Sequence, residues 1–112
     1  MSKFFQSELV RGDIQEMAAL QEFCFRSAVN LALLDKERKL EYFDALRTLL
    51  EKQKIFHARL QLSDDPEAKQ VEENMKQAVI MLGGNHKLSI QAMFDDLLQK
   101  VNEFEAAVKN GS

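Results

Sequence analysis

Two histidines and one cysteine are the side chains of this chain most able to do chemistry. His57 follows Gln53 by four residues, and this spacing places both polar side chains on one face of a helix. Because that face is otherwise apolar, we interpret Gln53 and His57 as a buried polar pair in which His57 hydrogen-bonds Gln53 or the backbone; a ligand role is the alternative. His86 lies beside glycines and is interpreted as a loop residue. Cys24 falls on an apolar helical stripe, where cysteine is usually an unreactive small hydrophobe.

No metal or catalytic motif surrounds these side chains. A carboxylate di-metal bundle needs Glu-x-x-His, but Lys54 and Gly83 stand three residues before the two histidines. The acidic pairs of the sequence are chain neighbours, which point about 100° apart on a helix and do not face a common ligand. We therefore expect no catalytic residue, no metal ligand and no cofactor, and we predict that the protein is not an enzyme. An enzyme or metal protein built around His57, Gln53 and Cys24 is the least favoured hypothesis.

Apolar residues recur at helical spacing through most of the 112 residues, and no segment alternates with the period of a strand. Helices are predicted over residues 7–33, 35–61, 65–82 and 89–109. Residues suited to helix ends mark these boundaries, namely Ser7, Asp35, Asp65-Pro66, Gly83-Gly84 and Ser89. Short connections between such helices indicate antiparallel neighbours. We predict one all-α domain over residues 1–112, an antiparallel bundle of about four helices.

The predicted second helix carries the widest apolar stripe, and we expect the other helices to pack against it. Basic residues border this stripe on both edges, which is typical of side chains that lay their stems over a core and keep the charge in water. They also define a second hypothesis, a nucleic-acid-associated regulator that binds through these edges. Their split arrangement and the net charge of −3 disfavour it. These residues are Lys36, Arg47, Lys52, Lys54 and Arg59.

Apolar side chains outside the helical stripes are the candidates for contact with a partner. Phe23, Ile55 and Leu62 lie off their stripes. Phe4 and Phe5 precede the first helix and either pack back onto it or offer an exposed contact. Our leading hypothesis is a non-enzymatic helical protein–protein interaction module, for which a regulatory role is one option. It uses these residues to bind another protein or a second copy of itself as a homodimer; a monomer with scattered surface apolar residues is the alternative.

The sequence carries no signal for a membrane or an oxidising compartment. Its apolar runs are far shorter than the ~20 residues that span a bilayer, and the N-terminus lacks the apolar segment of a secretory signal. The single cysteine excludes an internal disulfide. We expect a soluble, cytoplasmic protein without membrane contact.

Four groups of short motifs, spread over nearly the whole chain, occur in the order in which a known family has them. They are Phe4-Phe5-x-Ser7-Glu8-x-Val10, Ile55-Phe56 with Arg59 and Leu62-Ser63-Asp64, Leu82-Gly83, and Gln91-Ala92-Met93-Phe94-Asp95. This pattern resembles a family found in cyanobacteria and their phages and catalogued as domain of unknown function 1825. The resemblance implies the cytoplasm of a cyanobacterium or of a phage-infected host cell, and it brings no activity, cofactor or catalytic residue. The chain departs from the family pattern at His57, through Asp65–Glu73 and from Gly84 to Lys87.

Overall fold

The computed structural model describes residues 3–81 and 90–111, and within these ranges the chain is helical without any strand. The all-α fold predicted from the sequence is confirmed, with four long helices in the predicted order. The predicted Gly83-Gly84 stop, the His86 loop and the Ser89 cap lie outside the described residues. The elements are α1 (Lys3–Gln6), α2 (Glu8–Val29), the 3₁₀ helix η1 (Leu31–Leu33), α3 (Lys36–Leu62), α4 (Pro66–Met81) and α5 (Ile90–Lys109).

The predicted end of the first helix, at residue 33, is wrong. The start is correct, because the Ser7 hydroxyl accepts a hydrogen bond from the Val10 N–H at 3.5 Å and so caps α2. At the other end α2 stops at Val29, and Asn30 leaves helical geometry with φ −112° and ψ 17°. The chain then continues as the tighter turn η1, which reverses its direction without a glycine.

Aspartates begin the next two helices, as the sequence predicts. An Asp35 carboxylate oxygen accepts from the Arg38 N–H at 2.9 Å and caps α3. One oxygen of Asp65 accepts from the Glu67 N–H, and the other accepts from the Phe4 N–H, each at 2.9 Å. Asp65 therefore both starts α4 and fastens α1 to this end of the molecule.

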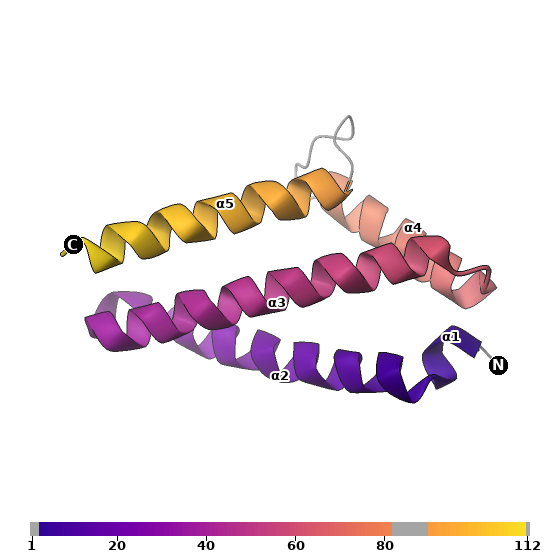
Figure 1. Ribbon diagram of the computed structural model, residues 1–112, viewed down its shortest axis with the longest axis horizontal. Coiled ribbons are helices and arrows are strands. Elements are labelled where there is room, and N and C mark those ends of the chain that lie inside the picture. Colours follow the sequence, from indigo (N-terminus) through magenta and orange to yellow (C-terminus); the bar gives the residue numbers. More distant parts are fainter. Residues whose placement is uncertain (1–2, 82–89, 112) are drawn as a thin grey trace.

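The helices form a thin, open layer around α3. Helix α3 lies in the middle, with α2 along one side and α5 along the other, both antiparallel to it (Figure 1). Helix α4 crosses obliquely behind the end of α3 (Figure 1). The overall extents are 49 × 33 × 19 Å, so the molecule is hardly thicker than two helices. Because α4 is much shorter than α3, it covers only one end of the layer.

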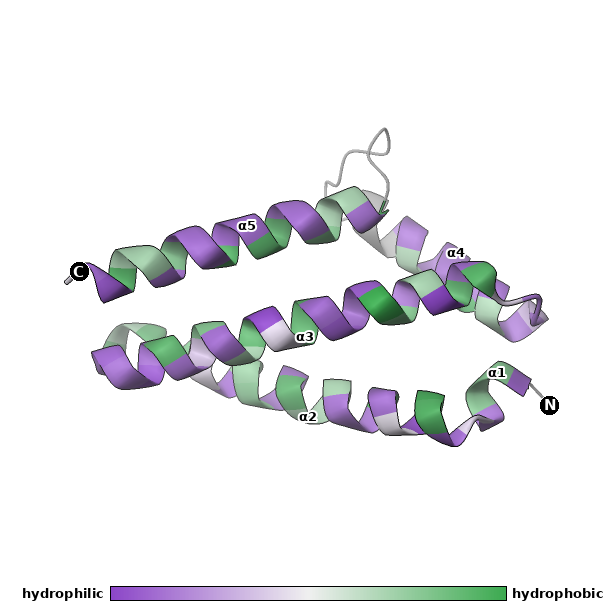
Figure 2. Ribbon diagram, in the orientation of Figure 1, coloured by the Kyte–Doolittle hydropathy of each residue, from purple (hydrophilic) through white to green (hydrophobic). Residues whose placement is uncertain are grey.

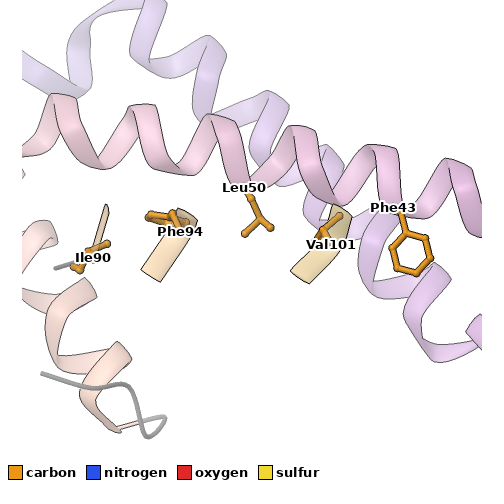
Figure 3. Close-up of a cluster of buried hydrophobic side chains, with 5 residues drawn as sticks. All are labelled: Phe43, Leu50, Ile90, Phe94 and Val101. Carbon is orange, nitrogen blue, oxygen red and sulfur yellow. The ribbon is translucent and has the colours of Figure 1, made fainter. Parts of the chain in front are cut away.

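The main core lies between α3 and α5. Phe43 and Leu50 of α3 pack against apolar residues from successive turns of α5 (Figure 3). Each such side chain contributes about 1.5–3 kcal/mol when it is removed from water. Leu60 of α3 and Ala68 of α4 are also inaccessible to solvent, and helices α3 and α4 pack against each other. The α5 members of the main core are Ile90, Phe94 and Val101.

None of the described helices combines the length and the apolarity that a membrane span requires.

Candidate interaction surface

His57 is buried, with 1% of its surface exposed, and its ring bonds the Gln91 side chain in place of Gln53 or the backbone, the two partners expected from the sequence. Its Nδ1 lies 3.0 Å from the Gln91 side-chain nitrogen, which also donates to the Lys54 carbonyl oxygen at 3.1 Å. Gln53 is only half-buried and lines a cavity instead. Helix periodicity placed both residues on one face, but α5 approaches that face at the level of His57 and brings Gln91 to it.

This environment keeps the imidazole neutral. Since the Gln91 amide donates, Nδ1 accepts, and the ring proton sits on Nε2. That Nε2 atom and Oε2 of Glu72 are both buried without a hydrogen-bond partner among the described residues. Burial lowers the pKa of His57, the Glu72 carboxylate opposes this effect, and Lys76 adds to it. His57 therefore serves as a neutral polar link between α3 and α5.

The remaining candidates for chemistry stand apart from His57. Cys24 is buried, and burial raises the pKa of its thiol, which keeps it in the unreactive protonated form. Among residues 3–81 and 90–111, no three His, Cys, Asp or Glu side chains gather in a way that would hold a metal ion.

Basic side chains of α3 form ion pairs and hydrogen bonds with residues of α2 and α5. Arg47 of α3 bonds Glu105 at 2.6 Å and Asn102 at 3.0 Å, both on α5. On the other side of α3, Lys52 pairs with Glu16 of α2 at 2.5 Å. The further pairs across the helices are Lys54 with Asp95 and Arg59 with Asp13, and Lys36 bonds the Lys109 carbonyl oxygen at 3.2 Å. The basic edges predicted from the sequence thus face α2 and α5.

Of the five apolar residues predicted to contact a partner, Phe4 and Phe5 pack inward. The Phe4 ring meets Phe5 at 4.9 Å and Phe56 of α3 at 5.7 Å, both edge to face. Phe5 lines a cavity together with residues of the other helices. Of the two roles expected for these residues, packing back onto the first helix or offering an exposed contact, the structure shows inward packing, but onto Phe56 of α3.

The other three predicted contacts are exposed. Phe23 borders a shallow hollow with Arg38 and Glu41. Ile55 and Leu62 lie seven residues apart on α3, and Leu62 is 85% exposed. Asp44 and Glu51 precede them on the same helix face, so Ile55 and Leu62 do not continue into a longer apolar stripe.

A larger set of exposed apolar residues lies on the face of the layer that α4 covers in part. We call this the groove face. Helix α2 contributes Ile14, Phe25 and Val29 to it, and Phe25 is 71% exposed. Apolar residues recur along the whole length of α2 (Figure 2). Helix α2 therefore has two apolar sides, one packed on α3 and one exposed.

Helix α5 borders the groove face from the opposite side. Phe104 is 60% exposed and stacks on Phe43 with ring centroids 6.3 Å apart. Leu97, seven residues earlier, is also exposed. Helical spacing predicts that both belong to the same apolar stripe as Phe94 and Val101, but those two residues are buried whereas Leu97 and Phe104 are exposed.

Two cavities mark the groove face. The first, of about 470 Å³, lies at the α4 end and is lined by residues of all five α-helices. Its lining includes Ile14, Met17 and Gln21 of α2, Gln53 of α3 and Met75 of α4. The second, of about 500 Å³, lies at the open end and has no α4 residue in its lining. That lining includes Ala28 and Val29 of α2, Ala32 of η1, Phe43 of α3 and Val108 of α5.

Sequence reasoning missed this surface, although a signal was present. Ile14, Gln21 and Ala28 form a series at seven-residue intervals, and Ala18, Phe25 and Ala32 form another on the same side. A helix with a second apolar series needs a second neighbour.

The fold and this surface define a class of protein: a thin all-α layer with one broad apolar face left open. The chain belongs to the family described as "Domain of unknown function (DUF1825)", whose model matches residues 2–108. The resemblance seen in the sequence motifs is thereby confirmed. No curated protein and no solved structure matches the chain.

Proposed function

We propose that the protein is a non-enzymatic interaction module that acts by binding another polypeptide chain through its groove face. The observation that carries this proposal is the exposure of apolar side chains on both sides of a groove that α4 fills at one end only. The regulatory role and the setting, the cytoplasm of a cyanobacterium or of a phage-infected cell, belong to the same proposal.

The area of the surface supports an interface. At about 150–200 Å² for a large apolar side chain, the exposed groove-face residues leave roughly 500 Å² of apolar surface in water. The largest apolar patches on soluble monomers are of this order and are often functional. The contributing residues are Ile14, Phe25, Val29, Leu97 and Phe104.

Nucleic-acid binding is less well supported. The basic side chains of α3 are used in pairs with α2 and α5, so their charge is locally neutralised. Arg47 and Lys52 also lie on opposite sides of α3 and present no common basic patch. If this alternative were correct, the purified protein would retard DNA or RNA at low salt, and binding would weaken steeply as salt is added.

Affinity capture tests the proposal. Tagged wild-type protein, a Phe25→Glu/Phe104→Glu variant and a Leu62→Glu control are used as baits in cells of the source organism. We expect quantitative mass spectrometry to find proteins that the wild type and the control capture and that the groove variant loses. Equal capture by all three folded baits would contradict the proposal. Helicity by circular dichroism confirms that each bait is folded.

A further inference from the structure

We infer that the cavity at the open end of the groove face, here called the open-end cavity, binds a free long-chain carboxylate. The carboxylate group of this ligand pairs with the Lys39 ammonium, and its hydrocarbon chain lies in the cavity. Such a site goes beyond the proposed function, because it needs no protein partner.

The open-end cavity has the size and the lining of a site for an apolar small molecule. Its volume of about 500 Å³ lies within the range of about 300–1,000 Å³ that is typical of small-molecule sites. A hydrocarbon chain in this cavity removes its own surface and that of the lining side chains from water. All but one of the seven lining residues are apolar, namely Ala28, Val29, Leu31, Ala32, Phe43 and Val108.

Lys39 is the seventh lining residue, and it brings a positive charge to the cavity. It lies in the first turn of α3 and is half-buried. Among residues 3–81 and 90–111, no side chain or carbonyl oxygen forms an ion pair or a hydrogen bond with its ammonium group. Asp35, one turn earlier, instead uses its carboxylate to accept from the Arg38 N–H. The charge of Lys39 is therefore available to an anion in the cavity.

Lys39 differs in this respect from the basic residues of α3 that hold the layer together. Lys36, one turn earlier, bonds the Lys109 carbonyl oxygen of α5 at 3.2 Å. Farther along α3, four basic side chains pair with carboxylates of α2 or α5. Lys39 joins no two helices in this way, and it is the one that borders an apolar cavity. The four paired residues are Arg47, Lys52, Lys54 and Arg59.

The single lysine indicates the chemical class of the head group. A lysine ammonium is a compact point charge that balances one negative charge, as a carboxylate carries. A phosphate monoester carries about −1.5 to −2 and is matched better by the planar fork of an arginine. The lysine stem can lie along the apolar wall while the ammonium stays near water, which places the carboxylate at the mouth and the chain inside.

The α4-end cavity provides an internal comparison. It is similar in volume and is also mostly apolar, but none of the described residues that line it is charged. Its polar lining residues are Gln21 and Gln53, which are neutral. An anionic ligand should therefore prefer the open-end cavity.

Fluorescence titration of the purified full chain with cis-parinaric acid, a fluorescent long-chain carboxylate, tests the inference. We expect saturable binding of one molecule per chain. The methyl ester of the probe has the same hydrocarbon chain without the charge, and it should bind about tenfold more weakly, because it loses a charge-assisted bond at a half-exposed site. No saturable binding of the acid, or equal binding of acid and ester by the wild type, would overturn the inference.

Variants assign the charge preference to Lys39. Lys39→Met should bind the acid as weakly as the ester, whereas Lys39→Arg should keep the preference for the acid. Lys100→Met is the matched control, because it removes the same charge from an exposed position of α5 outside this lining. An unchanged preference in Lys39→Met, or an equal loss in Lys100→Met, contradicts the assignment.

Two further measurements place the ligand. Ala28→Trp should fill the cavity and weaken the binding of both probes, and unchanged binding by this variant would overturn the inference. Sedimentation with phosphatidylglycerol vesicles distinguishes a free carboxylate from a membrane surface. Lys39-dependent binding to vesicles without binding of the free acid would likewise overturn it. Circular dichroism shows that each variant is folded. Capture through Phe25 and Phe104 is measured separately, so the proposed function and this inference can fail independently.

Discussion

Acidification between pH 7.5 and 5.5 should destabilise this protein through His57. The side chain is 1% exposed, and burial lowers its pKa in the folded state, with Lys76 adding to this effect and Glu72 opposing it. In the unfolded chain the pKa is near its ordinary value of 6.5. Below that value the unfolded state binds a proton that the folded state does not, so stability is full above pH 6.5 and falls as the pH decreases. One proton limits the slope to about 1.4 kcal/mol per pH unit, and the loss by pH 5.5 is therefore at most about 1.4 kcal/mol.

Chemical unfolding of the wild type and of His57→Gln, measured at intervals across this range, isolates the effect. The variant retains His86 and every carboxylate, so only the contribution of His57 differs between the two profiles. We expect the stability difference between wild type and variant to decrease as the pH is lowered. Parallel profiles from pH 7.5 to 5.5, or an NMR titration of His57 with a midpoint at or above 6.5, would refute this account of the buried imidazole.

Further predictions concern single residues. Gly12→Ala should raise the free energy of unfolding by about 0.5–1 kcal/mol in a denaturant melt, because an added Cβ meets no atom within 4 Å; an unchanged midpoint would contradict this. Leu60→Ala should cost about 2–5 kcal/mol, since Leu60 is fully buried, and a loss below 1 kcal/mol would show that the site collapses without penalty. Arg47→Met should cost about 1 kcal/mol by removing the bonds to Glu105 and Asn102. Arg47 also holds the pKa of Glu105 below its ordinary 4.5, so the variant should lose less stability than the wild type on acidification below pH 4.5, measured by unfolding at pH 3–5.

The start of a helix could be predicted from the sequence wherever the side chain of a capping residue determines it. Ser7, Asp35 and Asp65 cap the helices that they were expected to cap, because each cap depends on residues no more than three positions away. The end of α2 was placed four residues too late. Leu31 and Leu33 continue the apolar pattern, but the chain reverses there in a 3₁₀ turn that periodicity does not distinguish from a helix.

The candidate surface was harder to predict. The sequence left open whether Phe4 and Phe5 pack inward or are exposed. The position of Phe56 on another helix decides this, because the Phe4 ring packs on it. Phe104 fits the apolar stripe of α5 and is nevertheless exposed, because burial depends on whether a neighbouring helix covers that turn. Gln53 and His57 share a face, yet Gln91, thirty-four residues further along the chain, is the residue that bonds the ring.

The sequence by itself therefore determined that this protein is helical, where most of its helices begin, and which family it resembles. These properties depend on contacts within one or two helical turns. Only the tertiary structure decided that α3 is flanked by α2 and α5 in one thin layer, and that α4 covers this layer at one end only. A helix with two apolar sides has the same sequence pattern whether neighbouring helices cover both sides or only one, so the pattern does not predict which side is exposed. The exposure of Phe25 and Phe104 follows from the length and path of α4.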